Sequence, residues 1–319
     1  MIPAPFDYAR PASLDEACRI LDDADSGDGD VKVLAGGQSL LPLLRLRLAY
    51  PTLLVDVGRL GELRGVHDRD DHVLVGALTT HDEVLRSPLV REHAPLLALA
   101  TATVADPAVR HRGTFGGSLA HADPAGDLPA VALALDCVLV TASARGQREI
   151  PAAAFFTGYL ETALEPGEIL AGVKVPKLGA GWGFHYEKFH RTAQAWAVVG
   201  VAAAVRIEDG GIAQARIGLT NMGPVPVRAR AVEEALRGTA PAPGGPYGDG
   251  GARGGGRAEG AGGAGAGGPG GDGGRDPVRD ACGLADEGTS PPADLHAKPD
   301  YRRHLARVLT YRAVRSALG

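Results

Sequence analysis

Two glycine pairs beside hydroxyl side chains are the residues of this sequence best suited to chemistry. One pair lies in Thr114-Phe115-Gly116-Gly117-Ser118 and the other in Ala35-Gly36-Gly37-Gln38-Ser39. A glycine pair has no side chain to block a ligand, and its consecutive N–H groups can converge on one anion. A single motif of this kind suits one phosphate. Two of them, about eighty residues apart, indicate a longer ligand held at two points, as a dinucleotide would be.

Two carboxylates, Asp123 and Asp127, follow the second pair. Asp123 precedes Pro124 and is a residue type that fixes a turn through its side chain. His121 and Asp123 are potential metal ligands, but two residues without a third partner more often hydrogen-bond within a loop. No Ser/His/Asp set and no pair of carboxylates predicts a catalytic centre. We therefore assign no catalytic and no metal-binding residue.

The three cysteines, Cys18, Cys137 and Cys282, stand singly in the sequence. Their spacing excludes any CxxC-type site, and each is expected to be a small buried or half-buried residue. A protein-bound iron–sulfur cluster normally needs four thiolates. This chain cannot supply such a cluster alone.

Composition limits the function further. The 319 residues are long enough for two domains, and the hydrophobic fraction of 45% is ordinary for a globular protein. The net charge of −5 and the lack of a Lys/Arg run argue against a nucleic-acid surface. The N-terminus has no signal-peptide pattern, and no apolar stretch approaches the ~18 residues of a membrane span. We expect a cytoplasmic protein.

The elements that position the two motifs follow from apolar patterns and capping residues. Val31–Leu34 predicts a strand that leads directly into the first glycine pair. Thr80 and Glu83 form a capping box at the start of a helix, and Pro88 predicts a longer helix through about Ala102. A strand that enters a Gly-Gly loop is the context that phosphate binding needs.

A composition shift at residues 177–181 predicts a boundary between two domains, residues 1–176 and 177–319. Strands separated by Gly-containing turns and a helix over Tyr301–Leu318 are expected in the second domain. A flexible Gly-rich insertion is expected at about residues 240–292, because 18 of the 31 residues in 244–274 are glycine. A Gly-x-Gly-x-x-Gly match at Gly263, Gly265 and Gly268 carries no weight, since glycine repeats produce it by chance.

The two glycine motifs, with their flanking residues, resemble the FAD-binding medium subunit of the molybdenum hydroxylases, the xanthine dehydrogenase and aerobic carbon monoxide dehydrogenase type. The similarity covers essentially the whole chain. It is carried by residues 35–42, 46–49, 114–124, 155–159, 168–170, 186–189, 294–296 and 301–302. The resemblance implies an α+β fold: a two-subdomain FAD-binding domain of the p-cresol methylhydroxylase type, followed by a smaller α+β C-terminal domain in which helices accompany an antiparallel sheet.

The resemblance also implies which residues bind FAD. The two motifs would wrap the pyrophosphate, Asp127 would hold a hydroxyl, and Leu170 and Lys188 would add contacts from the flavin side and the second domain. Trp196 is interpreted as a core residue rather than as a platform for the flavin ring. The implied FAD-binding residues are Val33, Leu34, Ala35, Gly36, Gly37, Gln38, Ser39, Leu40, Val104, Thr114, Phe115, Gly116, Gly117, Ser118, Asp123, Asp127, Leu170 and Lys188.

The implied function is electron transfer through FAD, from 2Fe–2S clusters to NAD, a quinone or another acceptor. The implied partners are a 2Fe–2S small subunit and a molybdenum-cofactor large subunit, in a heterotrimer that dimerises. The substrate stays open between carbon monoxide, purines, aldehydes and N-heterocycles, because the molybdenum subunit selects it. Two alternatives remain: a self-sufficient FAD-dependent oxidase, and a non-catalytic nucleotide-binding scaffold.

Overall fold

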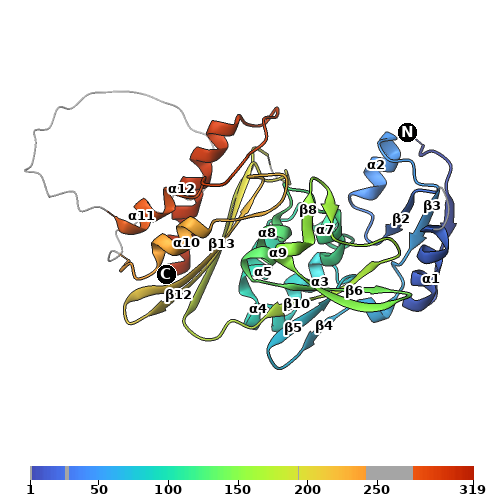
Figure 1. The fold of residues 1–319 in the computed structure, drawn as a ribbon, viewed down its shortest axis with the longest axis horizontal. Helices are drawn as coiled ribbons and strands as arrows, with labels where there is room; N and C mark the ends of the chain where they lie inside the picture. Colours follow the sequence, from blue (N-terminus) through green and yellow to red (C-terminus); the bar gives the residue numbers. More distant parts are fainter. Residues whose placement is uncertain (1, 26–28, 193, 242–275) are drawn as a thin grey trace, which may run out of the picture.

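The computed structural model describes residues 2–25, 29–192, 194–241 and 276–319. Within these residues the protein is a mixed helix-and-sheet fold (Figure 1). Three regions follow one another along the chain, and we call them the small lobe, the large lobe and the C-terminal region. The Gly-x-Gly-x-x-Gly match and residues 242–275 of the expected insertion lie outside the described residues.

The small lobe is a three-stranded parallel sheet in the order β1-β3-β2, packed against α1. The strand predicted at Val31–Leu34 is confirmed as β2, and it runs in register beside β3, with Leu34 opposite Asp56. Ala17, Cys18 and Leu21 of α1 supply the buried face. The elements are β1 (Asp7–Ala9), α1 (Leu14–Asp25), β2 (Val31–Leu34), α2 (Leu40–Leu46) and β3 (Leu53–Asp56).

The large lobe contains an antiparallel five-stranded sheet in the order β4-β5-β10-β6-β7 and a set of short helices. The capping box predicted at Thr80 and Glu83 is confirmed at the start of α3. The elements are η1 (Gly61–Leu63), β4 (Val66–Asp68), β5 (His72–Gly76), α3 (His81–Arg86), α4 (Pro88–His93), α5 (Pro95–Ala102), α6 (Pro107–Arg110), α7 (Phe115–His121), α8 (Asp127–Ala134), β6 (Val138–Ser143), β7 (Gly146–Pro151), α9 (Ala152–Phe155), β8 (Phe156–Gly158), β9 (Glu161–Thr162) and β10 (Ile169–Pro176).

The prediction of a single helix from Pro88 to about Ala102 is wrong. The segment forms two helices, α4 and α5, separated at Ala94, which has φ −136° and ψ 54°. Proline has no N–H to donate and disfavours a helical conformation in the residue before it. Pro95 therefore ends α4 and starts a new helix, and Pro88 starts α4 in the same way.

The C-terminal region is an antiparallel sheet in the order β11-β12-β13-β14, with helices on one face. Val201, Ala203 and Val205 of β12 belong to the core beneath those helices. Ala202 and Ala204 point to the opposite face and join the large-lobe core. The elements are β11 (Trp182–Phe189), β12 (Val199–Glu208), β13 (Gly211–Thr220), β14 (Val227–Arg228), α10 (Arg230–Leu236), α11 (Pro277–Cys282) and α12 (Pro299–Leu318).

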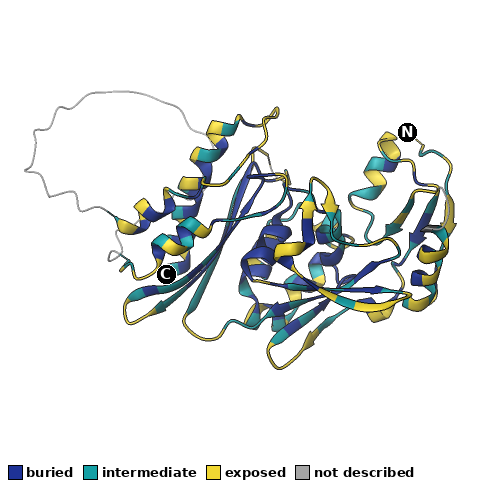
Figure 2. Ribbon diagram, in the orientation of Figure 1, coloured by how far each residue is buried: buried dark blue, intermediate teal, exposed yellow. Residues whose placement is uncertain are grey.

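Helix α8 of the large lobe packs against the C-terminal region. All eight of its residues are buried, and it lies between the two regions (Figures 1 and 2). A Cβ at Gly218 of β13 would lie 2.2 Å from the Ala130 carbonyl oxygen, so glycine is needed for this close approach. The predicted boundary at residues 176 and 177 falls at the last residue of β10. None of the described helices is both long and apolar enough to cross a bilayer.

The flexible Gly-rich insertion was expected to extend to about residue 292, and this is wrong for the residues that form α11. Asp276 caps α11, with Pro277 at the first helical position. Val278, Ala281 and Cys282 are buried in the core of the C-terminal region. The high glycine content ends at residue 274, and the following apolar residues bury enough surface to fold.

Candidate functional site

The first glycine motif is a loop between β2 and α2. Val33 and Leu34 end the strand, Gly37 has φ +72°, and Leu40 begins the helix. Among the described residues, no protein oxygen accepts a hydrogen bond from the backbone N–H groups of residues 36–39. The Gln38 side chain donates to the Gly36 carbonyl oxygen at 3.2 Å. The loop therefore presents a row of unpaired donors.

The second glycine motif is helical, which differs from the expected pair of converging N–H groups. Thr114 caps α7 by accepting from the Gly117 N–H at 3.1 Å. Phe115 N donates to the Thr79 carbonyl oxygen, and Gly116 N donates to that of Ala77, each at 2.9 Å. These N–H groups are already used within the protein. Glycine is required at position 116 because a Cβ would lie 2.4 Å from the Ala77 Cβ.

The two motifs, distant in the sequence, lie against each other. A Cβ at Gly36 would lie 2.1 Å from the Arg112 carbonyl oxygen and 2.9 Å from the Gly113 Cα. A Cβ at Gly117 would lie 3.9 Å from the Ala35 Cβ. The loop with the unpaired N–H groups in the small lobe thus adjoins Gly113 and Gly117 of the large lobe.

Asp127 and Lys188 form a buried ion pair between α8 and β11. Lys188 Nζ lies 2.7 Å from Asp127 Oδ2, and each side chain is 5% exposed. Lys188 also donates to the Thr103 carbonyl oxygen at 3.1 Å, and Tyr186 donates to Asp127 Oδ1 at 2.7 Å. Asp127 and Lys188, both predicted as site residues, therefore bind each other. Val104, a third predicted site residue, comes directly after Thr103 in the chain.

Burial dominates the electrostatics of this cluster. It raises the pKa of the Asp127 carboxyl, while the Lys188 ammonium and the Tyr186 hydroxyl act against that shift. Burial and the neighbouring Asp127 charge also raise the pKa of Tyr186 well above its usual value. Tyr186 therefore stays protonated at neutral pH, and its hydroxyl donates a hydrogen bond to Asp127.

The remaining predicted residues have different surroundings. Asp123 Oδ1 accepts from the Ala125 N–H at 2.8 Å, which is the turn-fixing contact considered from the sequence. The Val104 carbonyl oxygen accepts from Arg110 at 2.8 Å. Leu170 is 5% exposed and precedes an irregularity in the pairing of β10 with β6.

Sequence reasoning missed two members of the Asp127 cluster. Tyr186 bonds Asp127, and the Thr220 hydroxyl lies 3.4 Å from the Tyr186 hydroxyl and donates to the Gly126 carbonyl oxygen. Tyr186 and Lys188 are two residues apart on β11 and therefore share one face of the sheet. The two-residue spacing from Lys188 was the sequence signal that could have identified Tyr186. Nothing local to Thr220 indicates its role.

The interpretation of Trp196 as a core residue is wrong, because its side chain is 57% exposed. The segment that carries it is nevertheless fixed. Asn221 Nδ2 donates to the Ala197 carbonyl oxygen, and Asn221 N donates to that of Pro124, both at 2.8 Å. Trp196 thus belongs to a loop that Asn221 ties to the Asp123–Asp127 segment.

The three cysteines are all buried, as predicted. Burial raises the pKa of Cys282 to about 12, so its thiol is unreactive at neutral pH. In the described part of the chain, no group of three or more His, Cys, Asp or Glu residues is placed to hold a metal ion.

The geometry as a whole suits an anionic, extended ligand. Unpaired N–H groups in one loop can bind phosphate oxygens, and the adjoining motif offers hydroxyls and a surface free of side chains at Gly117. A pyrophosphate therefore fits the residues present.

Two family models match the chain. Residues 4–178 match the FAD binding domain in molybdopterin dehydrogenase. Residues 184–244 and 270–317 match the CO dehydrogenase flavoprotein C-terminal domain.

Named relatives agree with these matches. The chain is 40% identical to the carbon monoxide dehydrogenase medium chain of Hydrogenophaga pseudoflava over 75% of this chain and 83% of that one. It is 40% identical to the 6-hydroxypseudooxynicotine dehydrogenase complex subunit alpha of Paenarthrobacter nicotinovorans over 74% and 79% of the two chains. A solved structure of reconstituted CO dehydrogenase from Oligotropha carboxidovorans superposes with a TM-score of 0.86, at 32% identity, over 100% of this chain and 99% of that one.

Proposed function

This chain belongs to the family of FAD-binding medium subunits of molybdenum hydroxylases, and we propose that it is the electron-transfer subunit of such a complex. It is an oxidoreductase subunit and its cofactor is FAD. FAD supplies the redox chemistry, because it exchanges electrons singly or in pairs. In this proposal, electrons come from 2Fe–2S clusters and pass to NAD, a quinone or another acceptor.

The unpaired N–H groups of residues 36–39 carry the proposal. They would bind the FAD pyrophosphate, and Thr114 and Ser118 would add hydroxyl contacts from the adjoining motif. The remaining predicted residues, Val104, Asp123, Asp127, Leu170 and Lys188, are retained as members of the site. Residues 1–176 would form the FAD-binding domain, with two subdomains of the p-cresol methylhydroxylase type, and residues 177–319 the C-terminal domain.

The Asp127–Lys188 pair gives the C-terminal region a role in this site. Lys188 uses its ammonium group for Asp127 and the Thr103 carbonyl oxygen, and one of its three N–H donors is left for FAD. In the proposal Lys188 binds the cofactor and Asp127 orients Lys188, with Tyr186 fixing the carboxylate. The chain itself contributes binding and orientation, and no catalytic acid or base.

The proposed partners are a 2Fe–2S small subunit and a molybdenum-cofactor large subunit, in a dimerising heterotrimer in the cytoplasm. The absence of a four-cysteine set in the sequence supports a separate iron–sulfur subunit, since the chain has three cysteines. Relatives of similar identity carry the names of enzymes acting on different compounds, carbon monoxide and 6-hydroxypseudooxynicotine. Substrate selection is accordingly assigned to the large subunit.

The purified chain tests the proposal directly. We expect it to bind FAD, with a visible flavin spectrum, and to be reduced by a reduced 2Fe–2S partner but not by an organic substrate alone. Gly117→Asp should abolish binding, because it places a carboxylate between Ala35 and Thr114. Gly61→Ala is the control, since no atom lies within 4 Å of the added Cβ. A chain that binds no FAD would overturn the proposal, and reduction by substrate without a partner would favour a self-sufficient oxidase.

A further inference from the structure

The two glycine motifs lie on different lobes and pack against different buried clusters. The cluster beneath α1 also takes in Ala142 of β6 and Ile169 of β10 from the large lobe. The first motif follows β2 of the small lobe, and the second opens α7 of the large lobe. Ala17, Cys18 and Leu21 belong to one core, whereas Phe115 and Leu119 belong to the other. The spacing between the two halves of the site therefore depends on how the lobes are joined.

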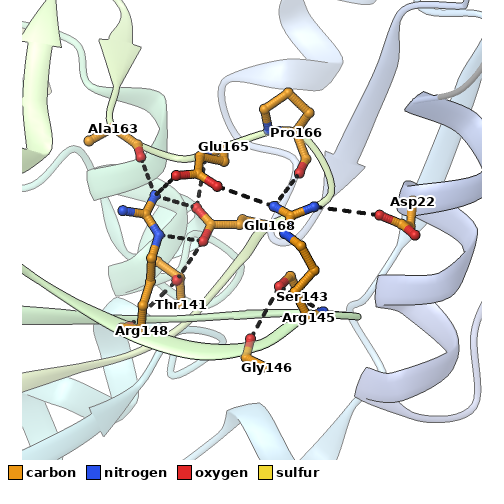
Figure 3. A network of polar contacts seen from close by, with 10 residues as sticks. All are labelled: Asp22, Thr141, Ser143, Arg145, Gly146, Arg148, Ala163, Glu165, Pro166 and Glu168. Carbon is orange, nitrogen blue, oxygen red and sulfur yellow. Dashed lines mark hydrogen bonds and ion pairs between the residues drawn. The ribbon is translucent and has the colours of Figure 1, made fainter.

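A turn at residues 165–168 is one such joint, and Figure 3 shows the side chains around it. Arg145, in the turn between β6 and β7, donates to Glu165 Oε2 at 3.2 Å and to the Pro166 carbonyl oxygen at 3.3 Å. Its Nη1 lies 3.6 Å from Asp22 Oδ1 on α1. A Cβ at Gly167 would lie 3.4 Å from the same Asp22 oxygen. The turn thus lies directly against the small lobe.

Glu168 fixes this turn from the inside. Its side chain is 3% exposed, and each of its two carboxylate oxygens accepts from two donors. Oε1 accepts from Arg148 Nε at 2.5 Å and from the Thr141 hydroxyl at 3.1 Å. Oε2 accepts from Arg148 Nη2 and from the Glu165 N–H, both at 2.7 Å. This two-point contact with a guanidinium fixes orientation as well as charge.

The contacts of Arg148 hold the network in its charged form. Arg148 Nη2 also donates to the Ala163 carbonyl oxygen at 2.6 Å, which ties the residues before the turn to β7. Although burial opposes it, the hydrogen bonds from Arg148, the Glu165 N–H and Thr141 hold the pKa of Glu168 below its usual value. Glu168 is therefore a carboxylate at neutral pH.

The residues after Glu168 lead to the site. Ile169 packs in the small-lobe core, and Leu170, its neighbour on β10, packs in the large-lobe core. The pairing of β10 is irregular after Leu170, and the Ala171 carbonyl oxygen accepts from the Ala77 N–H at 3.0 Å. The Ala77 carbonyl oxygen in turn accepts from Gly116 N at 2.9 Å. A continuous path connects the turn to the second glycine motif.

We propose that Glu168, held by Arg148, and Arg145, through Asp22, are positioning residues that set the spacing of the two glycine motifs and so the affinity for FAD. This inference rests on the proposed function, because it assigns these residues a role in FAD binding. None of these residues is among those proposed to bind FAD. They act by fixing the small lobe relative to β10 and α7.

The test compares FAD affinity in three variants of the full chain. Glu168→Gln keeps the side-chain volume and removes the charge, and we expect its FAD dissociation constant to rise about ten- to a hundredfold, as small misplacements of binding groups do. Arg145→Ala removes only an exposed link, and we expect a rise of about threefold. Glu149→Gln is the matched control: it breaks the exposed Lys174–Glu149 pair of the same sheet and should leave affinity unchanged.

A distance measurement separates positioning from simple loss of stability. Spin labels at Asp23→Cys on α1 and Glu92→Cys on α4 report the separation of the lobes without FAD, since both positions are exposed and the native cysteines are buried. We expect a narrow distance distribution in the labelled parent and in its Glu149→Gln form, and a broader one with Glu168→Gln. An unchanged distribution, or unchanged affinity in folded Glu168→Gln protein, would overturn the inference. A parent chain that binds no FAD would instead overturn the proposed function.

Discussion

Lys188 Nζ lies 2.7 Å from Asp127 Oδ2 in a contact that joins β11 of the C-terminal region to α8 of the large lobe. Both side chains are 5% exposed, so each charge has lost nearly all of its water. Tyr186 donates a further hydrogen bond to Asp127, and the Thr103 carbonyl oxygen accepts one from Lys188. Such a pair contributes little net stability, but removing one member leaves an uncompensated buried charge.

The first prediction concerns this pair. Asp127→Ala should lower the free energy of unfolding of the FAD-free chain by about 3–5 kcal/mol, because Lys188 would remain buried without a counter-charge. The double variant Asp127→Leu/Lys188→Met should recover most of that loss. Denaturant unfolding of the wild type, the single variants Asp127→Leu and Lys188→Met, and the double variant measures the coupling.

An exposed pair provides the control for this cycle. Asp300 lies 3.0 Å from Arg303 with a side chain that is 98% exposed, and Asp300→Ala should leave unfolding unchanged. A coupling free energy near zero between Asp127 and Lys188 would show that the two charges do not depend on each other.

Local signals in the sequence predicted the elements of the site better than its contacts. The Thr80–Glu83 capping box and the strand before the first glycine motif are both present. The second motif gave a weaker signal: Thr114 caps α7, but glycine at position 117 stands where Glu or Gln would complete a capping box. Its helical start was therefore missed, and its N–H groups were expected to be available.

Contacts between distant residues were beyond local patterns. Tyr186 and Lys188 share a face of β11 because side chains alternate along a strand. Their common partner, Asp127, is 59 and 61 residues away, and its position depends on how α8 packs on the sheet. The closeness of Gly36 to Arg112 is likewise set by packing of the two lobes. The local patterns of a single sequence do not indicate which distant residues come into contact.

A buried histidine predicts acid sensitivity. Burial, assisted by the nearby Arg110 charge, lowers the pKa of His81 to about 4, from 6.5 when unfolded. Between these values the unfolded chain binds more protons, so stability falls as the pH falls from 6.5 to 4, by about 3 kcal/mol in all. His81 is 4% exposed, and its Nδ1 has no hydrogen-bond partner within the described residues.

Unfolding measured across this pH range checks the histidine prediction. His81→Gln should reduce the slope of the unfolding free energy against pH by the amount that corresponds to the uptake of about one proton on unfolding. The wild-type chain, measured in the same buffers, is the reference for that slope. The same slope in the wild type and in His81→Gln would mean that His81 does not titrate as its burial implies.

The exposed Trp196 predicts an optical signal for FAD binding. Its loop is tied through Asn221 to the Asp123–Asp127 segment, so a bound flavin should quench its emission. The other tryptophan, Trp182, lies against the guanidinium groups of Arg206 and Arg216. Fluorescence titration should show that Trp196→Phe loses most of the FAD-dependent quenching, whereas Trp182→Phe keeps it. Equal quenching in both variants would place Trp196 away from the flavin.

The contact between the two glycine motifs makes the most specific prediction about affinity. A Cβ at Gly36 would lie 2.1 Å from the Arg112 carbonyl oxygen, and a backbone atom cannot move aside as a side chain can. Gly36→Ala should therefore separate the loop of residues 35–39 from the second motif. We expect the FAD dissociation constant to rise at least about tenfold, because binding groups on two lobes lose their alignment.

The cost of Gly36→Ala should appear in binding more than in folding, since the loop is half-buried and lies outside the β2 strand. Gly116→Ala is the informative contrast: its Cβ would meet Ala77 inside the large-lobe core, so that variant should lose stability as well. Calorimetric titration with FAD and thermal unfolding of the FAD-free chains measure the two effects separately. If Gly36→Ala bound FAD as tightly as Gly61→Ala, the close approach of the motifs would not be needed for the site.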